Sequence, residues 1–317
     1  IDPDNFKGLF STDLTAEGTW EAPNISGSLS FSGEKIAGIP LKSAEARWRY
    51  QQNRLDIADM KALLMGFPLE GHLAFVFEED TPGRIMVDLQ GSEADLSQLG
   101  ELDPRFADLT GRVNEFTLNL KGDINEPTGS ISFKAEKLAF RGYSLSGTDV
   151  NADIKKGLVD LKGKTSLMGA NISLGGNVTD FPGNARADIQ GSIRSLSLKE
   201  LKVVLPALSD IDPAGSLDAD YKIQGSLSEP LVSGKIWSQK LALMEQTFSN
   251  PSLFFEYHKD DLNFSSLKTA WRDTQISGEG KISEVSSPER KGDIIVKAAG
   301  LDSEFLEGFH PLVKEYG

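Results

Sequence analysis

The chain has 317 residues, a formal net charge of −14 and no cysteine. The negative charge argues against binding to nucleic acid or to an anionic membrane surface, and the lack of cysteine excludes disulfides and thiolate metal sites. Hydrophobic residues make up 39% of the chain. They never gather into the ~18-residue apolar run that a membrane helix needs, and no signal peptide is recognisable.

A phrase repeats three times along the chain: a glycine, a proline five residues later, and then a short apolar run. Its prolines are Pro23, Pro127 and Pro230, at spacings of 104 and 103 residues. Other short sequence patterns recur at nearly the same spacing, which indicates tandem copies of one unit. We therefore predict three repeats, residues 1–110, 111–214 and 215–317. Because the chain begins within the pattern, we expect it to be a segment of a longer protein.

Each repeat opens with a strand in which apolar and polar residues alternate. In the third repeat, Leu217, Ala219, Tyr221 and Ile223 share one face, as expected of a half-buried strand. The repeated proline follows and marks a connection or the start of the next strand. Two further strands are joined by a polar hairpin turn, at residues 51–54, 155–157 and 258–261.

The second half of each repeat carries two more alternating strands and a short helix. The clearest helix is predicted over residues 197–208, where Ser197 and Glu200 form a capping box and Leu201 and Leu205 begin an apolar stripe. Counterparts are predicted over residues 95–102 and 303–313. Each repeat is thus about six antiparallel strands with a short helix, so we predict an all-β fold.

The apolar residues of every predicted strand fall on one face of the sheet. That face could close on itself as a sandwich or barrel, or it could line an open trough. Small residues such as Ala44, Ala152 and Ala187 are frequent on it and fill a closed core poorly, which favours the trough. The residues expected to line this groove are Leu29, Phe31, Trp48, Ile57, Leu73, Phe75, Val87, Leu89, Phe116, Leu118, Leu120, Ile131, Phe133, Ile154, Leu161, Ile172, Leu174, Ile189, Leu217, Tyr221, Ile223, Ile236, Phe255, Tyr257, Phe264, Ile276, Ile282, Ile294 and Val296.

The repeated phrases resemble the AsmA-like superfamily of bacterial envelope proteins, most of all its TamB-type repeats. They are the glycine-to-proline phrase and the later Asp-Leu-Gln-Gly of residues 88–91 and Asp-Ile-Gln-Gly of residues 188–191. The resemblance runs from Gly8 to the end of the chain. It implies an extended, curved sheet of repeating β-groove modules, called a β-taco. It also implies a periplasmic protein of a Gram-negative bacterium, anchored to the inner membrane through a segment outside this chain.

The same resemblance implies a bridge that conducts phospholipids or other acyl lipids between the inner and outer membranes, and an outer-membrane barrel protein as a partner. Two alternatives stay open. The chain could be a periplasmic assembly factor that binds strands of outer-membrane proteins by β-augmentation. It could also be a structural scaffold with a closed β-core.

Candidate catalytic groups are few, and we predict that the protein is not an enzyme and uses no metal or cofactor. His72 is replaced by Asn177 and Lys281 in the other repeats. Asp88 and Asp188 recur, but the spacing places Val296 third, which is typical of a solvated strand face. No nucleophile elbow, phosphate loop or metal-binding helix motif is present.

Overall fold

The protein is described by a computed structural model. It covers residues 6–36, 39–64, 66–78, 83–101, 106–140, 142–180, 184–200, 213–243, 246–287 and 290–300. Strands dominate these residues, and each ladder between described strands is antiparallel. The prediction of an all-β antiparallel fold with short helices is confirmed. The chain divides into two compact units, Ile1–Thr165 and Ser166–Gly317.

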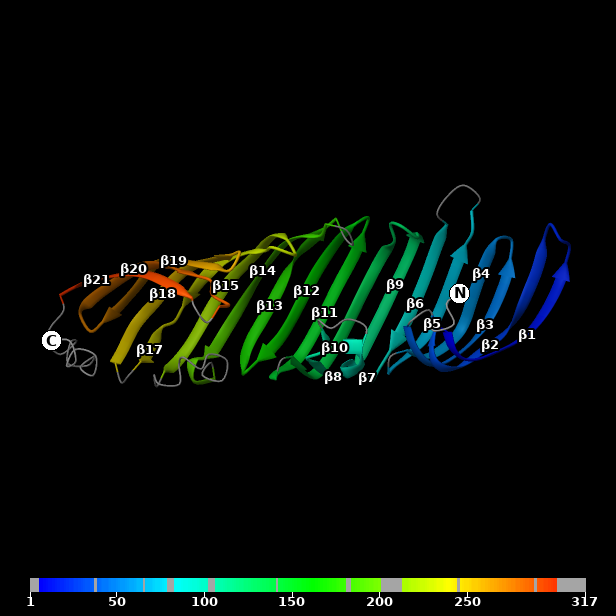
Figure 1. Ribbon diagram of the computed structural model, residues 1–317, viewed down its shortest axis with the longest axis horizontal. Coiled ribbons are helices and arrows are strands. Elements are labelled where there is room, and N and C mark those ends of the chain that lie inside the picture. Colours follow the sequence, from blue (N-terminus) through cyan, green and yellow to red (C-terminus); the bar gives the residue numbers. More distant parts are fainter. Residues whose placement is uncertain are drawn as a thin grey trace. The chain divides into compact units, whose positions relative to one another are not determined.

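Unit 1 is an antiparallel meander in which neighbours in the chain are mostly neighbours in the sheet (Figure 1). β8 pairs with β10 beside the β9–β10 ladder, and β7 pairs with β8. The elements of this unit are β1 (Phe6–Gly18), β2 (Pro23–Ile36), β3 (Ile39–Gln51), β4 (Arg54–Leu64), β5 (Phe67–Val76), β6 (Arg84–Gly91), β7 (Ala94–Asp95), the 3-10 helix η2 (Leu96–Glu101), β8 (Leu109–Val113), β9 (Glu115–Asp123), β10 (Thr128–Phe140) and β11 (Tyr143–Lys155).

Unit 2 is built in the same way, and β12 (Leu158–Leu167) contains the boundary between the units. Between β15 and β18, β17 continues the line of β16. The remaining strands are β13 (Ala170–Thr179), β14 (Arg186–Ser197), β15 (Ala214–Ser226), β16 (Leu231–Trp237), β17 (Lys240–Leu243), β18 (Gln246–His258), β19 (Asp261–Trp271), β20 (Thr274–Ser283) and β21 (Lys291–Ala299).

The predicted hairpin turns are confirmed by backbone geometry. Gln52 and Asn53 have φ angles of 51° and 56°, and Lys259 and Asp260 have 49° and 67°. Two consecutive positive φ angles define the type I′ turn, whose twist matches that of the flanking strands. The repeated prolines also lie where the sequence predicts, since Pro23 begins β2 and Pro127 and Pro230 immediately precede β10 and β16.

The predicted helices are confirmed only in part. The segment expected over residues 95–102 is η2, a 3-10 helix. Residues 198–200 are helical after the end of β14, and the rest of that predicted helix lies outside the described residues. The third, over residues 303–313, lies wholly outside them. Within the described residues, no helix is long and apolar enough to cross a membrane.

Candidate functional site: one apolar face in each unit

In unit 1, apolar residues line up across eight neighbouring strands. Residues directly opposite one another in a ladder share a face of the sheet, so the register can be followed from strand to strand. The line that we call the unit 1 row is Gly27, Trp48, Ile57, Leu73, Val87, Leu120, Gly129 and Ile154. No charged residue interrupts it, and every member is half-buried.

Unit 2 carries an equivalent line across eight strands. The unit 2 row is Leu174, Gly191, Tyr221, Gly234, Phe255, Phe264, Gly280 and Ile294. It is also free of charge, and its members are half-buried except Ile294, which is exposed. Both units therefore present an unbroken apolar line perpendicular to their strands.

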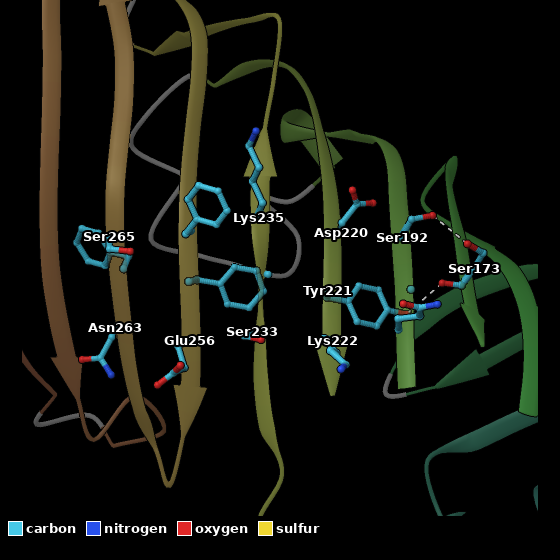
Figure 2. Close-up of a pocket in the computed structure, with 16 residues that line it drawn as sticks. Ser173, Ser192, Asp220, Tyr221, Lys222, Ser233, Lys235, Glu256, Asn263 and Ser265 are labelled. Atoms are coloured by element: carbon cyan, nitrogen blue, oxygen red, sulfur yellow. Dashed lines mark hydrogen bonds between the residues drawn. The ribbon is translucent and has the colours of Figure 1, made fainter. Parts of the chain in front are cut away.

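Aromatic rings and glycines are neighbours in the unit 2 row. A Cβ on Gly234 would come within 2.9 Å of the Phe255 ring, and one on Gly280 within 2.5 Å of the Phe264 ring. A Cβ on Gly191 would overlap the ring of Tyr221. Each ring thus lies against the bare backbone of the adjacent strand, and Figure 2 shows the ring of Tyr221 directed toward the strands of Ser192 and Ser173. Because these rings pack along the sheet, they project little from the apolar face.

The sequence-predicted lining residues fall on these same faces. Beside the unit 1 row, its face carries Leu29, Phe31, Phe75, Leu89, Phe116, Leu118, Ile131 and Phe133. Beside the unit 2 row, its face carries Ile172, Ile189, Leu217, Ile223, Ile236, Tyr257, Ile276, Ile282 and Val296. Leu161 lies in β12.

Not all of these side chains are open to a ligand. Phe116 and Phe133 pack against a closed cluster beside η2, formed by Ala94, Leu96, Val113, Ala135 and Leu138. Val113 is 3% exposed and Leu138 is 6% exposed, so this part of the sheet has an ordinary dry core. Phe31, Ile189 and Ile276 are also buried. The accessible part of each apolar face is therefore centred on its row.

A hollow of about 880 Å³ borders the unit 2 row. Besides row members, its lining contains their strand neighbours, including Ser192, Asp220, Lys235 and Glu256 (Figure 2). Strand neighbours point to the opposite face of a sheet. These neighbours lie on the face opposite to the row, so the hollow does not coincide with the apolar face that the sequence predicts.

The polar faces are held by ion pairs and hydrogen bonds. Arg54 donates to both carboxylate oxygens of Asp56 at 2.7 to 2.9 Å. These hydrogen bonds hold the pKa of Asp56 below its ordinary value. The ammonium group of Lys281 lies 2.6 Å from a carboxylate oxygen of Asp261, and this contact likewise holds the pKa of Asp261 below its ordinary value. Near the apolar face of unit 2, burial raises the pKa of the Tyr221 phenol, which donates to the Ser173 carbonyl at 3.3 Å.

One assignment from the repeat spacing is wrong. Gly71, Gly176 and Gly280 pair with Leu89, Ile189 and Ile294. The residue before each partner is Asp88, Asp188 and Asp293, so an aspartate, and not Val296, holds the third position. The spacing misled because the connections between these paired strands differ in length among the three copies: the glycine and its partner are 18 residues apart at Gly71, 13 at Gly176 and 14 at Gly280.

These three aspartates do not form a common centre. In the ladders Asp88 lies opposite His72, Asp188 opposite Asn177, and Asp293 opposite Lys281. Asp188 also pairs with Lys222 at 3.0 Å, while His72 approaches Asp56 at 3.5 Å. In the part of the chain that the structure describes, no three His, Asp or Glu side chains are grouped so that they could hold a metal ion.

Comparison of the chain with protein-family models, with curated proteins and with solved structures finds no match. The functional argument therefore rests on the two apolar faces.

Proposed function

We propose that the two apolar faces bind the acyl chains of lipids and that the protein carries lipids without catalysing a reaction. The observation that carries this proposal is the half-burial of both rows. Leu73, Val87 and Leu120 in unit 1, and Tyr221, Phe255 and Phe264 in unit 2, keep part of their surface exposed. Contiguous exposed apolar surface on a folded protein marks a site that another apolar body covers.

The energetics favour acyl chains. Each methylene transferred from water to an apolar surface contributes about 0.8 kcal/mol, so a chain of a dozen methylenes contributes several kcal/mol even when only half covered. The rows contain no charged side chain that would have to be desolvated beneath the chain. A lipid headgroup would remain in water beyond the edge of the face.

The dimensions favour movement along the row over capture at one point. Eight strands at ~4.8 Å spacing span roughly 34 Å, which is about twice the ~15 Å that one acyl chain occupies in half of a bilayer core. The unit 2 row offers neighbouring stretches of similar chemistry, because aromatic, glycine and aliphatic positions recur along it. An acyl chain that moves by one strand therefore loses one set of apolar contacts and gains an equivalent set.

The resemblance to AsmA-like envelope proteins supports the same proposal and makes it more specific. On that reading the lipids are phospholipids, the protein works in the periplasm, and its route runs between the inner and outer membranes. The partners would be the two membranes and an outer-membrane barrel protein.

A second candidate function is assistance in membrane-protein assembly. It draws on the two outermost strands, β1 and β21, each of which pairs with one described neighbour. An unpaired strand edge can accept an added strand by main-chain hydrogen bonding. A closed scaffold is the least favoured alternative, because it would bury the row residues that remain half-exposed.

The test compares two adjacent phenylalanines. Phe255 belongs to the unit 2 row, while Phe254 lies on the opposite face and is 49% exposed. Phe255→Lys should lower the amount of fluorescent fatty acid bound per protein, because only the unit 1 face then binds it, and Phe254→Lys should leave the bound amount unchanged, because only the first substitution places a charge under the acyl chain. Circular dichroism checks that both variants stay folded. Equal binding by both folded variants, or no binding by the unmodified protein, would contradict the proposal.

A further inference from the structure

A smaller hollow, of about 450 Å³, lies in unit 1 and is lined by three cationic side chains. They are Arg54 at the start of β4, Arg84 at the start of β6 and Lys121 near the end of β9. No acidic residue is found among the described residues that line this hollow. Because acidic residues outnumber basic ones by 47 to 33 in the chain, three cations around one hollow reverse the overall balance of charge.

The strand ladders place the three cations on one face of the sheet. Arg54 lies opposite Val76, and Val76 lies opposite Arg84. Lys121 lies opposite Met86, which is two residues from Arg84 in the same strand. Residues opposite one another in a ladder share a face, and so do residues two apart in a strand. Lys121 directly follows a member of the unit 1 row, so the shared face is the polar one.

Two of the cations have no partner in the part of the chain that the structure describes. Arg84 and Lys121 are exposed, and neither side chain forms a hydrogen bond or an ion pair there. Asp123 lies opposite Arg84 in the ladder, but its carboxylate accepts from the Asn125 amide at 2.8 Å. Both cations are therefore available to a ligand.

The third cation is held in place by a neighbour on its own strand. Arg54 donates from Nε and Nη2 to Asp56 at 2.7 to 2.9 Å, and its Nη1 has no hydrogen-bond partner among the described residues. The bonds to Asp56 orient the guanidinium group before any ligand arrives. Asp56 offsets only one of the three positive charges, so the hollow keeps an excess of positive charge.

The floor of the hollow is apolar, although strand alternation would place polar residues on this face. It is formed by Ala74 and Val76 of β5 and by Met86 of β6. Met86 is 45% exposed. An apolar surface with a few convergent charged groups is typical of a site for a small organic ligand. An organic anion suits this hollow better than an inorganic ion, because its apolar part would cover Val76 and Met86.

We propose that this hollow binds the phosphate group of an organic phosphate, with the apolar part of the ligand over Val76 and Met86. A guanidinium group matches the geometry of phosphate oxygens and donates charge-assisted hydrogen bonds to them, and the ammonium group of Lys121 adds a point charge. Arg54 and Arg84 can approach the same phosphate group from two sides, since the strand of Val76 lies between them.

Two sources share this chemistry, the headgroup of a phospholipid and a soluble phosphate ester. Arg54 and Arg84 are the first residues of their strands, so the hollow lies at an edge of the sheet. The headgroup of a lipid held on the unit 1 row would emerge at such an edge. The lipid source rests on the proposed function, whereas the phosphate site itself does not.

Calorimetric titration of the full chain tests the site. The ligands are a short-chain phosphatidic acid, below its micelle concentration, and the diacylglycerol with the same chains but no phosphate. We expect the unmodified protein to bind phosphatidic acid at least tenfold more tightly, with an advantage that falls as salt is added. In the double variant Arg84→Gln with Lys121→Gln, the two affinities should come within about twofold. Circular dichroism checks that this variant stays folded.

The matched control is Lys155→Gln with Lys156→Gln. It removes the same charge from two exposed lysines outside the hollow, so the preference for phosphate should persist. Equal binding of the two ligands by the unmodified protein would overturn the proposal. So would a preference that survives the loss of Arg84 and Lys121, or one that the control loses equally.

Titration with glycerol 3-phosphate distinguishes the two sources. A phospholipid headgroup is the ligand if phosphatidic acid binds at least tenfold more tightly than glycerol 3-phosphate, and a soluble ester is the ligand if the two bind equally. A protein that binds neither diacyl compound, but binds glycerol 3-phosphate through Arg84 and Lys121, would support the phosphate site and contradict the proposed function. Failure of all three ligands to bind would overturn both.

Discussion

Tyr221 lies directly opposite Gly191, and its phenol ring occupies the space that a Cβ on Gly191 would need. Phe255 and Gly234 repeat the relationship two strands away, and so do Phe264 and Gly280 on the far side of Phe255. Aromatic cover of a glycine stabilises a sheet position that has no side chain of its own. Here it also keeps the rings low on the apolar face.

The first prediction concerns that contact. Gly191→Ala should lower the free energy of unfolding by roughly 1–3 kcal/mol, because the added methyl group displaces the Tyr221 ring and also meets the Ser173 carbonyl. Urea denaturation measures the change. Gly292→Ala is the control, since a Cβ there has its nearest atoms at 3.9 Å. Equal losses for the two variants would contradict the packing described.

A second prediction follows from the raised pKa of Tyr221. Burial raises this pKa in the folded protein, so the folded state holds the phenol proton more tightly than the unfolded state, whose pKa is about 10. The stability that this contributes is complete below pH ~10 and is lost as the pH rises through the folded pKa. Denaturation across this range should therefore show a steeper alkaline loss for the unmodified protein than for Tyr221→Phe. Parallel curves would count against burial of the phenol.

A third prediction concerns the stability of the protein at acid pH. The Arg54 hydrogen bonds lower the pKa of Asp56 in the folded protein. Their contribution to stability is present above the unfolded pKa of about 3.9 and is lost as the pH falls through the lower folded pKa. Asp56→Asn removes this contribution. Its free energy of unfolding should fall less between about pH 5 and pH 2 than that of the unmodified protein. Identical acid profiles would show that the pair does not stabilise the sheet.

A fourth prediction separates the closed core from the accessible face. Leu138 lies in the cluster beside η2 and is 6% exposed, so Leu138→Ala should cost roughly 2–5 kcal/mol. Leu118 lies on the apolar face of unit 1 and is half-buried, so Leu118→Ala should cost less than half as much. If both substitutions cost the same, the face would be a closed core and the scaffold alternative would gain.

The features that the sequence predicts well are local and periodic. Alternation along single strands is enough to place Leu118, Tyr221 and Ile223 on an apolar face, and turn chemistry is enough to place the hairpins at Gln52 and Lys259. Each depends on neighbours within a few residues.

β-bulges could not be foreseen from alternation. Asp59, Ser195 and Ser266 have positive φ angles of 51°, 61° and 54°, and each lies where the ladder register shifts. The extra residue lets the apolar residues on both sides keep the same face although they are three apart in sequence. Ile57 with Met60, and Phe264 with Leu267, are examples. Side chains support two of these sites: Arg47 pairs with Asp59, and the Asp218 carboxylate accepts from the Ser195 amide at 2.8 Å.

Features that depend on residues distant in the sequence could not be predicted either. The cover that η2 places beside Phe116 and Phe133 depends on packing between segments that are distant in sequence. The third aspartate of the repeat, Asp293, emerged only from strand register, because a turn of different length shifts the spacing. Exposure of Leu14 and Ile294 depends on the position of their strands in the sheet, which no local pattern encodes.

The most direct test of the central claim uses tryptophan fluorescence. Trp48 belongs to the unit 1 row, whereas Trp20 is fully exposed. A variant that keeps only Trp48, with Trp20, Trp237 and Trp271 changed to Phe, is titrated with a phospholipid brominated along its acyl chains. A matching variant keeps only Trp20. Because bromine quenches at short range, we predict strong quenching of Trp48 and almost none of Trp20. Equal quenching of both, or quenching of neither, would contradict the proposal that the apolar face holds acyl chains.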